Sequence, residues 1–123
     1  MDKQRILVIE DDPMNLRLIF DLLNSEGFTT LTAQTAEEGI KIAKTELPVL
    51  IVMDVGLPGL DGIEATRRLK ADPKTQEIPI VFVTSYAMNN EREECLKAGA
   101  QGYLSKPIDT REFPALIKKL LKR

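Results

Sequence analysis

The chain has 123 residues, of which 43% are hydrophobic and 29% are charged, so it suits one globular domain and not a disordered chain. The formal net charge is −2, and the chain therefore lacks the basic excess that is typical of nucleic-acid-binding domains. It contains no histidine and a single cysteine, which excludes a phosphohistidine of its own and an internal disulfide.

The first half of the chain alternates apolar, strand-like runs with amphipathic, helical patterns. An apolar run at residues 6–9 predicts a buried strand. Asp12 and Pro13 then favour the start of a helix, because Asp accepts hydrogen bonds from the first turn and Pro has no N–H to leave unpaired. The next strand is predicted over residues 28–33, and the helix after it begins at Thr35, which has capping-box spacing to a glutamate.

The second half continues the same alternation. Residues 49–53 form the most apolar run and are therefore expected in the middle of the sheet. Cys95 falls in a predicted helix and is expected to pack in the core rather than to react. The elements predicted after residue 53, in chain order, are a helix capped by Asp61, a strand over residues 80–83, a helix over about 88–98, a strand over 101–105 and a final helix capped by Asp109.

Together these strand–helix units predict an open, doubly wound α/β sheet, because crossovers between parallel strands are right-handed and bury both sheet faces. No linker, repeat or low-complexity segment interrupts the pattern, so we expect one domain over residues 1–123 and no output domain. The N-terminal residues do not fit a secretory signal, and no apolar run is long enough to cross a bilayer. We therefore expect a cytoplasmic protein that binds neither membranes nor nucleic acid.

Charged side chains directly follow three of the predicted strands. Glu10 and Asp11 come after the first strand, Asp54 after the third and Lys106 after the fifth. Ligands of such sheets bind beyond the carboxyl ends of the strands, where these side chains are expected to meet. Crowded carboxylates repel one another, and a hard divalent cation, which prefers oxygen ligands, relieves that repulsion. The sequence therefore predicts a site for a divalent cation and a phosphoryl group.

Other residues near these strand ends are ambiguous when taken singly. Thr84 follows the fourth strand and could donate to a phosphoryl oxygen, but β-branched residues are also common in strands. The glycine-rich segment after Asp54 could approach a ligand closely or could simply connect two elements. Lys106 precedes Pro107, so the bond between them is a candidate for a cis peptide. The ammonium group of Lys106 could neutralise phosphate or pair with Asp54 in an empty site. A carboxylate can also attack a phosphoryl group and form an acyl phosphate.

Taken together, these motifs resemble the receiver domain of two-component response regulators over essentially the whole chain. The chain is most similar to stand-alone receivers of the cell-cycle DivK type and the chemotaxis type. The resemblance implies the CheY-like or flavodoxin-like (βα)5 sheet with strand order 2-1-3-4-5. The segments that carry it are Ile9-Glu10-Asp11, Met53-Asp54 with the loop Leu57-Pro58-Gly59-Leu60-Asp61-Gly62, Val83-Thr84-Ser85, and Tyr103-Leu104-Ser105-Lys106-Pro107.

The resemblance also implies roles for the acidic residues. Asp54 would be the phosphoacceptor, and a histidine kinase or a histidine phosphotransfer protein would supply the phosphoryl group. Asp11 and Asp54 would bind Mg²⁺ directly together with the carbonyl of Gly56, while Glu10 would act through water. Mn²⁺ could substitute for Mg²⁺. Such a chain catalyses only its own phosphorylation and dephosphorylation and is not expected to be a turnover enzyme.

Further roles come from the same resemblance. Thr84 and Lys106 would contact the phosphoryl group, and Tyr103 would be the switch aromatic whose rotamer follows Thr84. The output surface, made by the fourth helix, the fifth strand and the fifth helix, would cover about residues 88–121. It would bind a partner protein that the sequence does not identify, with the chain a monomer or a phosphorylation-dependent dimer. Judged by its pattern alone, Tyr103 is an ordinary half-buried strand residue.

Two positions depart from common receiver patterns. Gly56, two residues after the acceptor, has no side chain to orient a hydrolytic water. Tyr86, two residues after Thr84, is bulky enough to shield the phosphoryl group. We therefore expect slow self-dephosphorylation and a long-lived signal.

Other functions stay open on the residues alone. The main alternative is a HAD-like, aspartate-based phosphohydrolase, although such enzymes typically need a second acid at the place where Gly56 stands. A flavin-binding module of flavodoxin shape would need a phosphate loop after the first strand, where Glu10 and Asp11 would repel the flavin phosphate. A receiver-like adaptor that never takes phosphate fits less well, because the full set of site residues is present.

Overall fold

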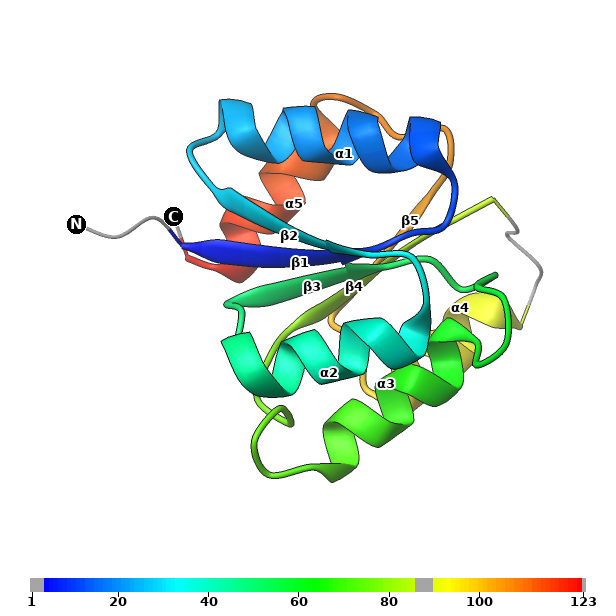
Figure 1. Ribbon diagram of the computed structural model, residues 1–123. Helices are drawn as coiled ribbons and strands as arrows, with labels where there is room; N and C mark the ends of the chain where they lie inside the picture. The colour runs from blue at the N-terminus through cyan, green and yellow to red at the C-terminus, as the bar shows by residue number, and fades with distance from the viewer. Residues whose placement is uncertain (1–3, 86–89, 123) are drawn as a thin grey trace.

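The computed structural model describes residues 4–85 and 90–122. Its centre is a 5-stranded parallel sheet in the order β2-β1-β3-β4-β5, with helices on both faces (Figure 1). The strands are β1 (Arg5–Ile9), β2 (Thr29–Ala33), β3 (Leu50–Met53), β4 (Ile80–Thr84) and β5 (Gly102–Ser105). The helices are α1 (Pro13–Ser25), α2 (Ala36–Glu46), α3 (Gly62–Ala71), α4 (Glu91–Ala98) and α5 (Glu112–Leu120). The predicted sheet, its strand order and the central place of β3 are confirmed.

The sheet separates two apolar layers. Successive strand residues point to opposite faces, so in β1 Leu7 and Ile9 belong to the apolar layer that includes α2, α3 and α4, while Ile6 and Val8 belong to the layer that includes α1 and α5. Figure 1 shows the same division, with α1 and α5 on one side of the sheet and the other helices opposite. Because both faces are covered, β3 is buried at every position, which explains why its sequence is a continuous apolar run.

The second strand begins at Thr29, one residue later than predicted. Phe28 closes helix α1 instead, because its N–H donates to the carbonyl of Leu23 at 3.1 Å. The N–H of Gly27 donates to the carbonyl of Asn24 at 3.0 Å, and Gly27 has a φ of 90°. This pair of bonds is a Schellman motif, in which glycine supplies the left-handed backbone.

Side-chain caps begin three helices as the sequence predicts. The side chain of Asp12 accepts a hydrogen bond from the N–H of Met14 (3.1 Å), that of Thr35 from the N–H of Glu38 (3.2 Å), and that of Asp61 from the N–H of Glu64 (2.9 Å). Asp109 accepts from the N–H groups of Arg111 and Glu112, at the turn that leads into α5.

Three further predictions concern the last third of the chain. Cys95 is buried in α4, as expected, and the Lys106–Pro107 peptide bond is cis. The predicted start of α4 at residue 88 lies outside the described residues, which resume at Asn90. No helix in the described parts of the chain is both long enough and apolar enough to span a membrane.

Candidate functional site

The carboxyl ends of β1 and β3 bring three acidic residues together. The two strands end in register, with Ile9 paired to Met53, and the N–H of Asp54 donates to the carbonyl of Ile9 at 3.1 Å. Glu10 and Asp11 therefore leave β1 beside the point where Asp54 leaves β3. One carboxylate oxygen from each of these three acids lies within 4.8 Å of the others.

The surroundings of these acids differ. Glu10 is 1% exposed, Asp54 is half-buried and Asp11 is exposed. Burial raises the pKa of Glu10 above its ordinary value, and the charge of Asp54 adds to this rise, while hydrogen bonds from Lys106 and the N–H of Asp12 oppose it. Three carboxylates this close form a donor set that suits a hard divalent cation.

Lys106 reaches this cluster from the end of β5. Its Nζ lies 2.7 Å from Oε1 of Glu10 and 3.2 Å from Oδ2 of Asp54. Burial alone would lower the pKa of Lys106, but the hydrogen bond with Glu10 and the charge of Asp54 outweigh it, and the pKa is raised. The pair with Asp54 was expected from the sequence, whereas the shorter contact with Glu10 was not.

Two glycines lie near the backbone of Asp54, and they differ in the space that surrounds the position of a Cβ. The N–H of Gly56 donates to Oδ1 of Asp54 at 3.1 Å. Among the described residues, a Cβ added at Gly56 would meet no atom within 4 Å beyond its two chain neighbours. A Cβ at Gly62 would lie 2.4 Å from the carbonyl oxygen of Asp54 and 2.9 Å from the ring of Phe82. Gly62 therefore lets the first turn of α3 pack directly against the backbone of Asp54.

Thr84 lies at the carboxyl end of β4, next to the strand that carries Asp54, and is 2% exposed. Its carbonyl accepts from the N–H of Lys106 at 2.8 Å, which fixes the end of β5 to the end of β4. The structure thus brings Glu10, Asp11, Asp54, Thr84 and Lys106 to one edge of the sheet. Tyr86 lies outside the described residues.

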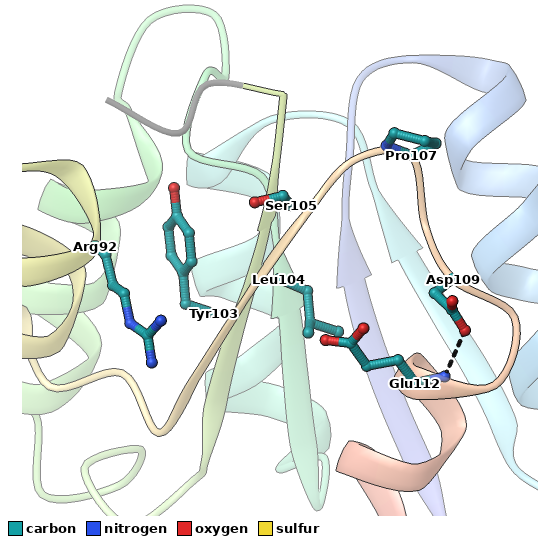
Figure 2. A pocket seen from close by; sticks show the side chains of 7 residues that line it. All are labelled: Arg92, Tyr103, Leu104, Ser105, Pro107, Asp109 and Glu112. Atoms are coloured by element: carbon teal, nitrogen blue, oxygen red, sulfur yellow. Dashed lines mark hydrogen bonds between the residues drawn. The ribbon is translucent and has the colours of Figure 1, made fainter. Parts of the chain in front are cut away.

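Tyr103 is half-buried on β5, as its sequence pattern indicates. Its hydroxyl donates to Oε1 of Glu91, the first residue of α4, at 2.7 Å. Tyr103 and Arg92 line a hollow of about 380 Å³ together with Asp109 and Glu112. In Figure 2, Tyr103 lies beside Arg92, and Asp109 and Glu112 lie on the other side. Glu91 was missed in the sequence, because it is one of three glutamates in the first turn of α4 and nothing in the pattern separates it from the others.

Gly62 was also passed over as a residue with a particular role. Its signal in the sequence is a glycine directly after a helix cap, at a place where a residue with better helix propensity would ordinarily stand.

Comparisons with known proteins agree with this geometry. The family model of the response regulator receiver domain matches residues 6–118. The polar-differentiation response regulator DivK of Brucella ovis is 34% identical over 116 residues, which cover 94% of each chain. A CheY-like receiver domain protein from Methanospirillum hungatei superposes with a TM-score of 0.91 at 30% identity, covering 98% of this chain and 95% of that one.

A third relative is the receiver domain of a sensor histidine kinase from Pseudomonas aeruginosa. It superposes with a TM-score of 0.91 at 32% identity and covers 99% of this chain and 100% of that one. Its crystal structure contains a magnesium ion coordinated in the active site cleft.

Proposed function

The chain belongs to the response regulator receiver domain family, and we propose that it is a phosphorylation switch of a two-component system in which Asp54 accepts the phosphoryl group. The observation that supports this most strongly is the set of three carboxylates within 4.8 Å, with the ammonium group of Lys106 in contact with two of them. The donor would be a histidine kinase or a histidine phosphotransfer protein.

Glu10, Asp11 and Asp54 would hold Mg²⁺ together with the carbonyl of Gly56, and Mn²⁺ would be a substitute. The carboxylate oxygens suit this role because hard cations prefer oxygen ligands. The magnesium ion in the related Pseudomonas receiver domain supports the same assignment. When bound, a divalent ion supplies positive charge that offsets the carboxylates and the phosphoryl oxygens.

The chain's own residues would carry the transfer. A carboxylate oxygen of Asp54 attacks the phosphorus of the partner's phosphohistidine, so a P–O bond forms while the P–N bond breaks. The electron pair of the P–N bond leaves with the imidazole, and Asp54 becomes an acyl phosphate. Lys106 would then turn its charge from the two carboxylates to the phosphoryl group, and Thr84 would donate from its hydroxyl.

Phosphorylation would bias an existing two-state equilibrium of the fold. Thr84 and Tyr103 would be the residues that change between the two states. The affected surface would be α4, β5 and α5, within about residues 88–121, and it would bind an output protein or a second copy of the chain. Gly56 itself has no side chain to orient a hydrolytic water, so the phosphorylated form would decay slowly.

Incubation with acetyl phosphate and Mg²⁺, followed by intact mass measurement, tests the proposal. We expect a gain of about 80 Da, the mass of HPO₃, that is absent in Asp54→Asn and without Mg²⁺. A mass gain that persists in Asp54→Asn would overturn the assignment of the acceptor. Turnover of a generic aryl phosphate would instead favour the HAD-like phosphohydrolase.

A further inference from the structure

The hydrogen bond between Tyr103 and Glu91 joins β5 to the first turn of α4. The hydroxyl of Tyr103 donates to Oε1 of Glu91 at 2.7 Å, and both residues are half-buried. Glu93 and Glu94 share the same helical turn but are exposed. Glu91 therefore differs from its neighbours by its contact and not by its charge.

The rest of α4 offers little to hold its first turn in place. The buried side chains of this helix are Cys95 and Ala98, and both lie in its second half. Asn90, at the N-cap position, makes no side-chain capping hydrogen bond. With so few buried apolar groups, the start of α4 belongs to the less stable part of the fold, and the bond to Tyr103 links it to the sheet.

The two ends of this bond lead back to the two groups proposed to contact the phosphoryl group. Tyr103 lies on β5, and Lys106 comes directly after that strand, three residues later. Glu91 follows Thr84 by seven residues in the chain. The N–H of Lys106 donates to the carbonyl of Thr84, so the residues that precede Glu91 and follow Tyr103 in the chain are joined at the ends of β4 and β5. Since hydrogen bonds weaken steeply as their geometry departs from the ideal, a small shift of β5 relative to α4 is enough to break this one.

We propose that Glu91 is a positioning residue that holds Tyr103 against α4 in the unphosphorylated protein, and that this hydrogen bond opens when Asp54 is phosphorylated. The inference rests on the proposed phosphorylation switch and adds the residue that stabilises its resting state. Loss of the bond alone shifts the equilibrium toward the state that phosphorylation favours.

Tyrosine fluorescence gives a direct readout of this bond. The chain has no tryptophan and its 2 tyrosines are Tyr86 and Tyr103, so Tyr103 is the sole emitter of this kind in a Tyr86→Phe background. A carboxylate that accepts a hydrogen bond from the phenol quenches tyrosine emission. In that background we expect Glu91→Ala to raise the emission and the matched variant Glu93→Ala to leave it unchanged. Equal emission in Glu91→Ala and its parent would overturn the contact.

The second measurement adds beryllofluoride and Mg²⁺, which together mimic the phosphorylated site. We expect the emission of the parent to rise toward that of Glu91→Ala, and the emission of Glu91→Ala to stay where it is. In the native background, the concentration of acetyl phosphate that gives half-maximal phosphorylation should fall about fivefold in Glu91→Ala, the factor that corresponds to one ordinary hydrogen bond. Glu91→Gln keeps an acceptor oxygen and should restore the value to within about twofold of the native one.

The outcomes separate this inference from the proposed function. If the native protein gains no mass with acetyl phosphate, the proposed function fails, and with it the opening of the bond on phosphorylation. If the native protein is phosphorylated but Glu91→Ala and Glu93→Ala behave alike, Glu91 has no positioning role. If emission rises in Glu91→Ala but beryllofluoride changes nothing in the parent, the bond is a static one.

Discussion

Lys106 is in contact with Glu10 and Asp54 at once, at 2.7 Å and 3.2 Å. It therefore links the end of β5 to the ends of β1 and β3, neither of which is a neighbour of β5 in the sheet. The contact with Glu10 is the shorter, and Glu10 is also the more deeply buried acid. In the resting protein the lysine is therefore shared between the two acids, and its charge is already at the place where a phosphoryl group would need it.

Replacing Lys106 should destabilise the protein, because the buried carboxylate of Glu10 would lose its cationic partner. We expect Lys106→Met to lower the free energy of unfolding by about 2–4 kcal/mol in the absence of divalent ions. Urea denaturation checks this. Lys44→Met, which removes a more exposed ion pair with Asp72, is the control and should cost less than about 1 kcal/mol. Equal losses in the two variants would contradict the role of Lys106.

Removing one acid of the cluster should have the opposite effect. Asp11 is exposed and lies within the repelling group, so Asp11→Asn should raise the melting temperature by about 2–4 °C without divalent ions. In the native protein, Mg²⁺ at ten times its Kd should add about 1.4 kcal/mol of stability, and in Asp11→Asn this gain should be largely lost. Glu93→Gln should keep the full response to Mg²⁺. A response that Asp11→Asn leaves unchanged would place the cation elsewhere.

The two glycines near Asp54 should respond differently to alanine. Gly62→Ala places a Cβ 2.4 Å from the carbonyl oxygen of Asp54, so we expect a loss of about 1–3 kcal/mol in unfolding free energy and slower phosphorylation. Gly56→Ala adds a Cβ into space that the described residues leave open, and it should change the stability by less than about 0.5 kcal/mol. Thermal or chemical denaturation of the two variants side by side tests this, and a larger loss in Gly56→Ala would refute it.

The thiol of Cys95 should be inert in the folded protein. Burial raises its pKa from 9.0 to about 12, so the reactive thiolate is scarce at neutral and mildly alkaline pH. We expect iodoacetamide to label Cys95 only in the unfolded protein at pH 8. Between pH 9.0 and about 12 the folded chain keeps a proton that the unfolded chain loses, so this group's contribution to stability is full below pH 9 and decreases above it. Rapid labelling of the native protein would contradict the burial of this side chain.

Leu47 should be a site where a small change increases stability. It ends α2 with a φ of 46° and is 54% exposed, so its side chain packs little and strains the backbone. Leu47→Gly should raise the unfolding free energy by about 1 kcal/mol, because glycine adopts this conformation without a steric penalty. Leu47→Ala keeps the Cβ and should gain little. A destabilised glycine variant would show that the contacts of Leu47 outweigh its backbone strain.

The parts of this molecule that the sequence predicts are those that depend on neighbours in the chain. The apolar runs of β3 and β4 and the caps at Asp12, Thr35 and Asp61 are local signals, and the structure confirms them. The gathering of acids at one sheet edge follows from topology, since parallel strands end together. The same reasoning could not rank Glu10 above Asp54 as the partner of Lys106, because that choice depends on fractions of an ångström.

The link between Tyr103 and Glu91 was beyond sequence reasoning for a different cause. It joins a strand residue to one of several equivalent glutamates on a helix, and only the packing angle of α4 selects which one is reached. The start of β2 was misjudged because Phe28 is apolar, as a strand residue would be, while its N–H is engaged in closing α1.

β5 is the last strand of the sheet, and its residues are less buried than those of β3 and β4. A rearrangement on this flank needs to disturb only one ladder of backbone hydrogen bonds, whereas the same displacement of an inner strand would break two. The proposed switch would therefore remodel the margin of the sheet while the three strands at its centre keep their shape, so that repeated cycles of phosphorylation would not approach unfolding.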